Sequence, residues 1–215
     1  MLTERNKRIR SNLTVLFCTL LTAAAICGHY LWDDWGFYRK VSKEETALRK
    51  TVVSTAERYL GYNERDGSHR QIIDRYNNHD PLAMGYEVTY SDSWCAAFVS
   101  AVAIECGVTD LIPTECGCER QIGLFQELDC WEEQDSAIPL PGDLIYFDWN
   151  MEDTDECTGW ADHVGIVVGT KWPFIKVIEG NLNDSVDYHY LHLNHIQIRG
   201  FAKPDYAGFL AGKMP

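Results

Sequence analysis

Hydrophobic residues recur along this chain with two different periods, first helical and then strand-like. Between residues 42 and 128 their spacing is typical of amphipathic helices, which we expect at 42–61, 67–77, 91–107 and 118–128. Beyond residue 142, β-branched runs alternate with polar residues and predict strands at 143–149, 163–169, 174–179 and 196–203. Helices followed by antiparallel strands indicate an α+β fold, with N-terminal helices packed on a central antiparallel β-sheet.

Polar residues mark the ends of two of these helices. Ser42 and Glu45 form a capping-box pattern at the start of the first helix, and Gly61 is available as its C-terminal stop. Asp92 and Ser93 are the expected N-cap residues of the helix within 91–107.

Cys95 stands at the start of that apolar helix, in the run SDSWCAAFVSAVAIECG. The first turn of a helix has unpaired N–H groups and the positive end of the helix dipole, and both lower the pKa of a thiol. Cys95 is therefore our candidate for an activated thiol nucleophile. A small, buried and unreactive cysteine is the alternative interpretation.

A predicted hairpin brings polar residues together near the C-terminus. The segment DHVGIVVGTKWPFIKVIEGN predicts two strands joined at 170–173, with His163 opening the first and Glu179 closing the second. Depending on the length of the turn, His163 lies opposite Glu179, Gly180 or Asn181. Because side chains alternate between faces, Glu179 and Asn181 share one face of the hairpin. The opposite, core face then carries Val164, Ile166 and Val168.

These residue types supply the parts of a nucleophilic site. An imidazole such as His163 takes the proton of a thiol, and a carboxylate or amide fixes the imidazole tautomer and raises its basicity. A lone histidine at a strand end is more often a surface or core residue, but its combination with Cys95 and Glu179 indicates acyl transfer. The backbone N–H of Cys95 is the expected oxyanion donor.

Four motifs occur in order along the chain: WCAAFVSAV at 94–102, PGDLIYFDW at 141–149, DHVGIVVG at 162–169 and VIEGN at 177–181. Together they resemble the CHAP domains (cysteine, histidine-dependent amidohydrolase/peptidase) of bacterial cell-wall hydrolases, over roughly residues 52–206. The resemblance implies a papain-like core. It also implies that Cys95 is the nucleophile, that His163 is the base, and that Glu179 orients His163 with the help of Asn181.

The function implied by this resemblance is hydrolysis of peptidoglycan. The bond would be an amide or peptide bond in the stem or bridge peptides, cleaved by an N-acetylmuramoyl-L-alanine amidase or an endopeptidase, and the residues do not choose between the two. No cofactor is expected. Four aromatic residues are candidate groove walls for a glycopeptide, although each is more typical of a core: Tyr90, Trp94, Trp149 and Trp160.

The remaining metal-ligating residues do not predict a metal site. Some CHAP domains carry closely spaced aspartates before the cysteine, whereas this chain has only Glu87 and Asp92 there, too few for a calcium ion. Three histidines recur at every third position of a segment that alternates like a strand, so successive members face opposite sides. We interpret them as surface or hairpin histidines: His189, His192 and His195.

The other cysteines beyond the N-terminal region permit disulfides in an exported protein, although their number is odd. They are Cys106, Cys116, Cys118, Cys130 and Cys157. Cys116 and Cys118 are too close in sequence for an ordinary bridge, and the pairing stays open. A zinc site using these two and a histidine is an alternative, but the spacing is not that of a common zinc motif.

Composition and charge narrow the class of partner. A chain of 215 residues can bury one substantial core. Its formal charge of −13 argues against nucleic acid or anionic lipid as the main partner, because its field repels polyanions. The expected partner, peptidoglycan, is implied by the resemblance to CHAP domains and not by the charge, and the oligomeric state is not indicated.

The N-terminal region divides into a basic segment at 1–12 and an apolar segment at 13–32. The apolar segment predicts either a transmembrane anchor or a cleavable signal peptide. Either interpretation places the CHAP-like catalytic domain, residues 42–215, outside the cytoplasmic membrane at the cell surface. Two other functions are kept as alternatives. One is an inactive, membrane-anchored module that binds the cell wall, which an intact set of Cys95, His163 and Glu179 disfavours. The other is a secreted effector that uses the same chemistry, which a membrane anchor disfavours.

Overall fold

The computed structural model describes residues 41–133, 138–150 and 159–212. All of them belong to one compact unit, Phe37–Pro215. The predicted basic segment at 1–12 and apolar segment at 13–32 lie outside the described residues. Within those ranges, the helices are too short or too polar to cross a membrane.

The described helices and strands follow one another in the predicted order. The helices are α2 (Lys43–Glu57), α3 (Arg70–Asn77), α4 (Cys95–Cys106), α5 (Cys118–Glu127) and α6 (Tyr206–Leu210), with a short 3-10 helix η1 (Ala83–Gly85). The strands are β1 (Trp131–Glu133), β2 (Leu144–Phe147), β3 (His163–Lys171), β4 (Phe174–Leu182), β5 (Ser185–His192) and β6 (Ile198–Ala202).

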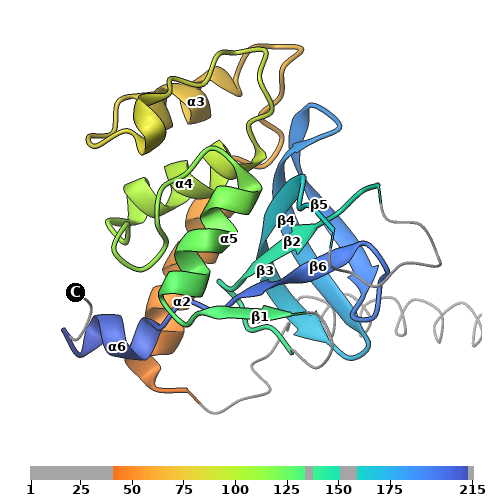
Figure 1. Cartoon of the computed structure of the whole chain (residues 1–215). Coiled ribbons are helices and arrows are strands. Elements are labelled where there is room, and N and C mark those ends of the chain that lie inside the picture. The colour runs from red at the N-terminus through yellow and green to blue at the C-terminus, as the bar shows by residue number, and fades with distance from the viewer. Residues whose placement is uncertain (1–40, 134–137, 151–158, 213–215) are drawn as a thin grey trace, which may run out of the picture. The chain divides into compact units, whose positions relative to one another are not determined.

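The six strands form one antiparallel sheet with the order β1-β6-β2-β3-β4-β5. Helices α2, α4 and α5 lie on one side of this sheet (Figure 1). The predicted α+β class and the antiparallel sheet are therefore confirmed. The list of predicted strands omitted β1 and β5, and the list of predicted helices omitted α6.

The predicted ends of α2 are partly right. The Ser42 hydroxyl accepts a hydrogen bond from the Glu45 N–H at 3.0 Å, so the N-cap is confirmed. The Glu45 carboxylate accepts a hydrogen bond from Arg49 at 2.9 Å. Gly61 is not the helix stop, because α2 ends at Glu57 and the chain continues through turns to Gly61 in a left-handed conformation.

The predicted N-cap of α4 is wrong. Trp94 occupies the cap position and its side chain makes no capping hydrogen bond. Asp92 instead accepts hydrogen bonds from the Thr89 N–H at 2.8 Å and from the Tyr86 hydroxyl at 2.9 Å. These bonds stabilise the loop that precedes the helix. The Trp94 side chain consequently caps none of the first-turn N–H groups of α4, and the Ala96 N–H interacts with the Cys95 sulfur.

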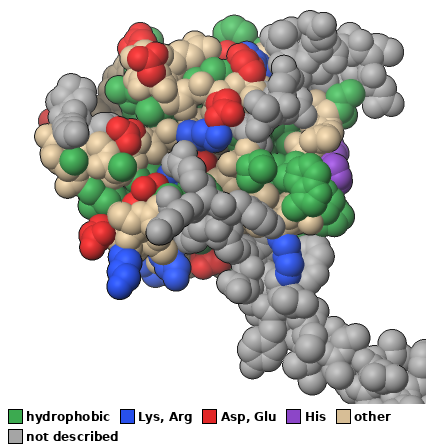
Figure 2. All heavy atoms as spheres, turned by 90° about the horizontal axis from the view of Figure 1, so that it is seen from below, with side chains coloured by type: hydrophobic (Ala, Val, Ile, Leu, Met, Phe, Trp, Pro, Cys, Tyr) green, Lys and Arg blue, Asp and Glu red, His purple; other side chains and the backbone are tan. Residues whose placement is uncertain are grey.

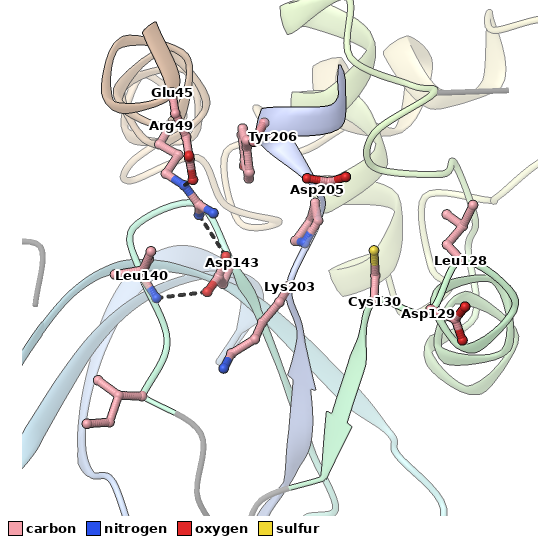
Figure 3. Close-up of a pocket in the computed structure, with 13 residues that line it drawn as sticks. Glu45, Arg49, Leu128, Asp129, Cys130, Leu140, Asp143, Lys203, Asp205 and Tyr206 are labelled. Atoms are coloured by element: carbon pink, nitrogen blue, oxygen red, sulfur yellow. Dashed lines mark hydrogen bonds and ion pairs between the residues drawn. The ribbon is translucent and has the colours of Figure 1, made fainter. Parts of the chain in front are cut away.

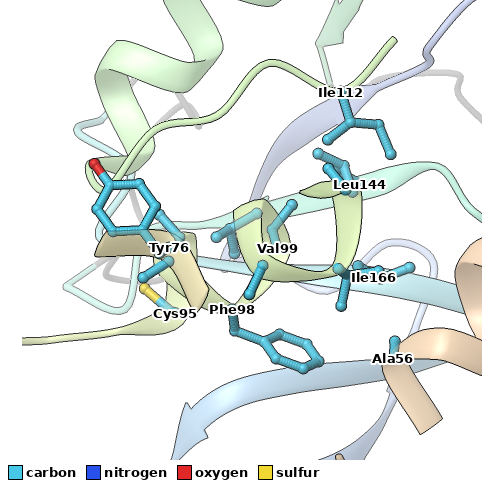
Figure 4. Packing of buried hydrophobic residues seen from close by; sticks show 14 of the residues in the cluster. Ala56, Tyr76, Cys95, Phe98, Val99, Ile112, Leu144 and Ile166 are labelled. Atoms are coloured by element: carbon cyan, nitrogen blue, oxygen red, sulfur yellow. The ribbon is translucent and has the colours of Figure 1, made fainter. Parts of the chain in front are cut away.

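Two clusters of buried apolar side chains cover the two faces of the sheet. The larger cluster joins the helices to one face, and α4 is buried continuously from Cys95 to Ala103 within it (Figure 4). Val164 and Ile166 belong to this cluster and Val168 packs against it, which confirms their predicted core face. The smaller cluster occupies the opposite face, where Phe147, Val177 and Leu191 meet.

A buried ion pair ties α2 to the start of β2. Arg49 donates to Asp143 at 2.7 Å and to the Pro141 carbonyl at 3.0 Å, and the two charged side chains are 3% and 2% exposed. Both residues line a cavity of about 610 Å³, which also includes Lys203 and Tyr206 (Figure 3). The lining contains neither Cys95 nor any other predicted catalytic residue.

Acidic side chains on the face shown in Figure 2 occur in several separate positions among apolar and basic side chains. They are not gathered in one place on this face.

Removing the positive charge of Arg49 should strongly destabilise the fold. The substitution Arg49→Met keeps most of the volume but leaves Asp143 buried without its partner, which costs about 3–5 kcal/mol. Urea unfolding would measure this loss of free energy. Arg58→Met is the control, because the Arg58 side chain is 58% exposed in its pair with Glu105, and it should leave the unfolding midpoint nearly unchanged. Equal losses in both variants would contradict this account of the Arg49 pair.

Candidate active site

Cys95 is the first residue of α4 and is only 4% exposed. Its sulfur interacts with the Cys118 sulfur at 3.8 Å, with the ring of His163 and with the Ala96 N–H. The hydrogen bond with Cys118, the hydrogen bond and charge of His163, and the Ala96 N–H together outweigh burial and hold the Cys95 pKa well below its usual value. The predicted activation of this thiol therefore has a structural basis.

His163 is the first residue of β3 and is buried. Strand β3 pairs with β4 so that Gly165 faces Glu179, and the two strands join through the turn at 172–173. This register brings the Glu179 side chain back toward the start of β3, where His163 Nε2 lies 3.0 Å from Glu179 Oε2. The other ring nitrogen, Nδ1, is thus the one left to exchange a proton with Cys95.

Glu179 is fully buried and both of its oxygens are hydrogen-bonded. Oε2 faces His163, and Oε1 lies 2.9 Å from Nδ1 of His189. Burial alone would raise the Glu179 pKa, but the hydrogen bonds and charges of the two histidines more than offset it and lower the pKa. The carboxylate is therefore an anion that accepts an N–H from each ring.

His189 is a member of the site that the sequence interpretation missed. The prediction of a hairpin histidine is right for its position, because β4 and β5 form a hairpin, but its half-buried contact with Glu179 was not predicted. It lies opposite Val177 in the β4–β5 ladder, on the face that carries Glu179. The alternation noted around His189 contained this signal, since a β4–β5 hairpin places it beside Glu179. His192 is exposed, as predicted.

Two glycines allow this close arrangement. A Cβ at Gly165 would lie 2.6 Å from Glu179 Cγ and 2.5 Å from a methyl group of Val177, so the missing side chain leaves the space that Glu179 crosses. A Cβ at Gly180 would lie 2.4 Å from Phe98 Cβ. Gly180 therefore lets α4, which carries Cys95, approach β4 closely.

Aromatic rings cover the two histidines. The Trp149 ring centroid is 5.4 Å from that of His163 and 5.8 Å from that of His189, and Trp149 stacks on Phe147 at 5.0 Å. These rings reduce the access of water to the Glu179 hydrogen bonds and strengthen the electrostatic interactions there.

The site therefore holds a thiolate beside an imidazolium. Burial alone would lower the His163 pKa, but Cys95 and Glu179 reverse this effect and raise it from 6.5 to about 10. At pH values between the lowered pKa of Cys95 and the raised pKa of His163, Cys95 carries a negative charge and His163 a positive charge. Such a pair combines a ready nucleophile with a proton donor for a leaving group.

The structure also describes Asn181 and the aromatic residues that were considered as groove walls. Asn181 follows Glu179 by two positions, is half-buried and has a left-handed backbone with φ of 60°. Its assisting role stays a prediction. Trp94 is a core residue, as its type favoured, and not a groove wall, because it is fully buried and donates its N–H to Glu64. Trp160 is 76% exposed and Tyr90 is also exposed.

The described cysteines are all free thiols: Cys95, Cys106, Cys116, Cys118 and Cys130. Cys157 lies outside the described residues. In the ranges 41–133, 138–150 and 159–212, no group of three or more His, Cys, Asp or Glu side chains is arranged to hold a metal ion.

Comparison with known proteins assigns no family. No protein-family model matches the chain, and a search of curated proteins finds no match. Matching solved structures include two crystal structures of Ly7917. The structure with the hydrolyzing product of MDP has 10% sequence identity and a TM-score of 0.41, and the other has 13% identity and a TM-score of 0.40. Each match covers 73% of this chain and 62% of the Ly7917 chain. Similarity at this level assigns neither a family nor a function.

Cys95 should react with iodoacetamide at neutral pH, whereas Cys106 at the other end of α4 should not. Burial raises the Cys106 pKa above 9, so its rate should increase only in alkaline solution. The Cys95 rate should fall only in acid, as pH drops through its lowered pKa. Cleavage after glutamate separates peptides 88–105 and 106–115, so mass spectrometry reads both rates in one sample. A Cys95 that reacts only above pH 9 would contradict the thiolate assignment.

Proposed function

We propose that this protein is a peptidoglycan hydrolase that cleaves an amide or peptide bond through Cys95. The observation that carries the proposal is the connected set of interactions from Cys95 to His163, and from His163 through a hydrogen bond to the buried Glu179. A structural cysteine has no need of an imidazolium beside it or of a buried carboxylate behind that ring. The set has the order of nucleophile, base and orienting anion.

The first half of the reaction forms a thioester. The Cys95 thiolate attacks the carbonyl carbon, and the negative charge that develops on the carbonyl oxygen faces the start of α4. The Cys95 N–H is the expected donor to that oxygen. His163 then gives its proton to the leaving amine, and the carbon–nitrogen bond breaks.

The second half returns the enzyme to its starting state. Neutral His163 takes a proton from water, which attacks the thioester and releases the acid product. Cys95 leaves as a thiolate and the imidazolium is restored. Glu179 stabilises the charged ring in both halves of the cycle, and His189 holds the second oxygen of Glu179 in place.

The choice of peptidoglycan comes from the sequence. The motifs around Cys95, Leu144, His163 and Glu179 resemble those of CHAP domains, and the described elements that carry them are α4, β2, β3 and β4. The bond is therefore expected in a stem or bridge peptide, or between the glycan and the stem. The negative charge of the chain gives no electrostatic attraction to anionic wall polymers.

The N-terminal region would bring the enzyme to this substrate. The apolar segment at 13–32 lies outside the described residues, and we propose that it acts as a membrane anchor or an export signal. Either role places the catalytic domain outside the cytoplasmic membrane, where its substrate lies.

Purified full-length protein should release new amine termini from peptidoglycan. Wall preparations with different stem and bridge peptides would be incubated with it, and the products read by mass spectrometry. Cys95→Ala should reduce release by at least about 10³-fold, because it removes the nucleophile. The position of the cut would distinguish an amidase from an endopeptidase.

The matched control is Cys106→Ala, which removes a thiol from the opposite end of the same helix and should retain activity. If no wall is cleaved but both wild type and Cys95→Ala bind it, the hydrolase proposal fails. The protein would then be a wall-binding module.

A further inference from the structure

A second thiol lies against the candidate nucleophile. The sulfurs of Cys95 and Cys118 are 3.8 Å apart, and the two residues are 4% and 7% exposed. Each is the first residue of its helix, Cys95 of α4 and Cys118 of α5. The hydrolytic cycle described above makes no use of Cys118.

Hydrogen bonds fix the start of α5 beside α4. Ser100 on α4 donates to the Glu115 carbonyl at 2.6 Å and accepts from the Glu115 N–H at 2.8 Å. The Glu115 carboxylate in turn accepts from the Cys116 N–H at 2.7 Å and from Arg120 at 2.8 Å. Cys118 is thus held near Cys95 by bonds that do not involve either sulfur.

A further contact ties α5 to the sheet. The Tyr146 hydroxyl on β2 donates to the Gln121 side chain at 2.9 Å, and both residues are fully buried. The turn between 115 and 118 is therefore held from the helix side and from the sheet side. The proximity of the two sulfurs is a property of the packed core rather than of a surface loop.

We propose that Cys95 and Cys118 form a reversible oxidation site, at which a hydroperoxide converts the two thiols into a disulfide that blocks the nucleophile. The inference rests on the proposed function in one respect. If the carbonyl of a peptide reaches the Cys95 sulfur, a molecule as small as hydrogen peroxide reaches it as well.

The first step oxidises Cys95. Its thiolate attacks one oxygen of hydrogen peroxide, the sulfur–oxygen bond forms and the oxygen–oxygen bond breaks. The departing hydroxide takes the proton of the His163 imidazolium and leaves as water. Cys95 becomes a sulfenic acid, having lost two electrons to the peroxide.

The second step joins the two sulfurs. Cys118 attacks the sulfenic sulfur, the sulfur–oxygen bond breaks, and hydroxide leaves with the thiol proton as water. Overall, two thiols and one peroxide give one disulfide and two waters. The sulfurs must close from 3.8 Å to about 2.05 Å.

The charge on Cys95 controls when Cys118 can react. In the reduced site, the hydrogen bond with Cys95, burial and the Cys95 charge raise the Cys118 pKa well above 9, so Cys118 stays a thiol. Oxidation to the neutral sulfenic acid removes that negative charge. Cys118 then ionises more readily, just when its partner becomes the electrophile.

The test uses reduced full-length protein treated with hydrogen peroxide, then alkylated and cleaved after glutamate. This cleavage separates Cys95, in peptide 88–105, from Cys118, in peptide 116–119. Mass spectrometry should find the two peptides joined by a disulfide. A thiol reductant should restore most of the lost hydrolytic activity.

Two variants identify the partner thiol. Cys116→Ser is the matched control, since Cys116 shares the short peptide but its sulfur accepts from Arg120 instead, and this variant should retain the cross-link. Cys118→Ser should lose the cross-link and proceed to an irreversible sulfinic acid at Cys95. Wild type that forms the same sulfinic acid without a cross-link would overturn the proposal, as would loss of the cross-link in Cys116→Ser.

The cross-link is measured without substrate, so the two proposals can fail separately. A protein that forms the disulfide but cleaves no wall retains the oxidation site and loses the proposed function. A protein that cleaves the wall but forms no disulfide retains the proposed function and loses the oxidation site.

Discussion

The buried carboxylate of Glu179 is the group on which the candidate site depends. Removing an ion from water costs several kcal/mol unless its oxygens find partners, and an isolated glutamic acid at this position would be protonated and neutral. Here each oxygen accepts a hydrogen bond from a different histidine ring. The carboxylate therefore remains charged, and its charge favours the imidazolium form of His163. Cys95 favours the same cation, which in turn favours the thiolate of Cys95 together with the hydrogen bond of Cys118. The buried anion therefore supports the charged state of the connected residues.

Two glycines on neighbouring strands allow these groups to come together, because neither has a side chain. Gly165 leaves the space across which Glu179 reaches His163, and Gly180 lets α4 pack closely on β4. His163 lies beside Phe147 on the sheet face opposite the helices, while Cys95 comes from a helix on the other side. Their meeting point is consequently at the ends of β3 and α4. Hydrogen bonds made by Ser100 and Tyr146 hold the start of α5 beside α4, and Cys118 consequently lies within reach of Cys95, the candidate nucleophile.

Local patterns were sufficient for part of this arrangement and insufficient for the rest. Cys95, His163 and Glu179 could be predicted because helix starts and hairpin alternation are local features, and a short turn limits the register. His189 was expected at the surface or in a hairpin but not in the site, because its spacing to the other histidines was considered only for metal binding. The contact of His189 with Glu179 depends on the β4–β5 turn. Asn183 and Asp184 adopt left-handed conformations in this turn, and the identity of a single residue rarely predicts such a conformation. Cys118 meets Cys95 through the packing of two helices, which no sequence period encodes.

The most direct test of the central claim is the titration of His163 by nitrogen-15 NMR in wild type and in Glu179→Gln. With Glu179 ionised, the His163 ring should remain protonated well above its ordinary pKa of 6.5 and lose its proton near pH 10. The amide in the variant has no negative charge, so the His163 pKa should fall by about one to three units. A wild-type His163 that titrates near 6.5, or an identical titration in both proteins, would contradict the account.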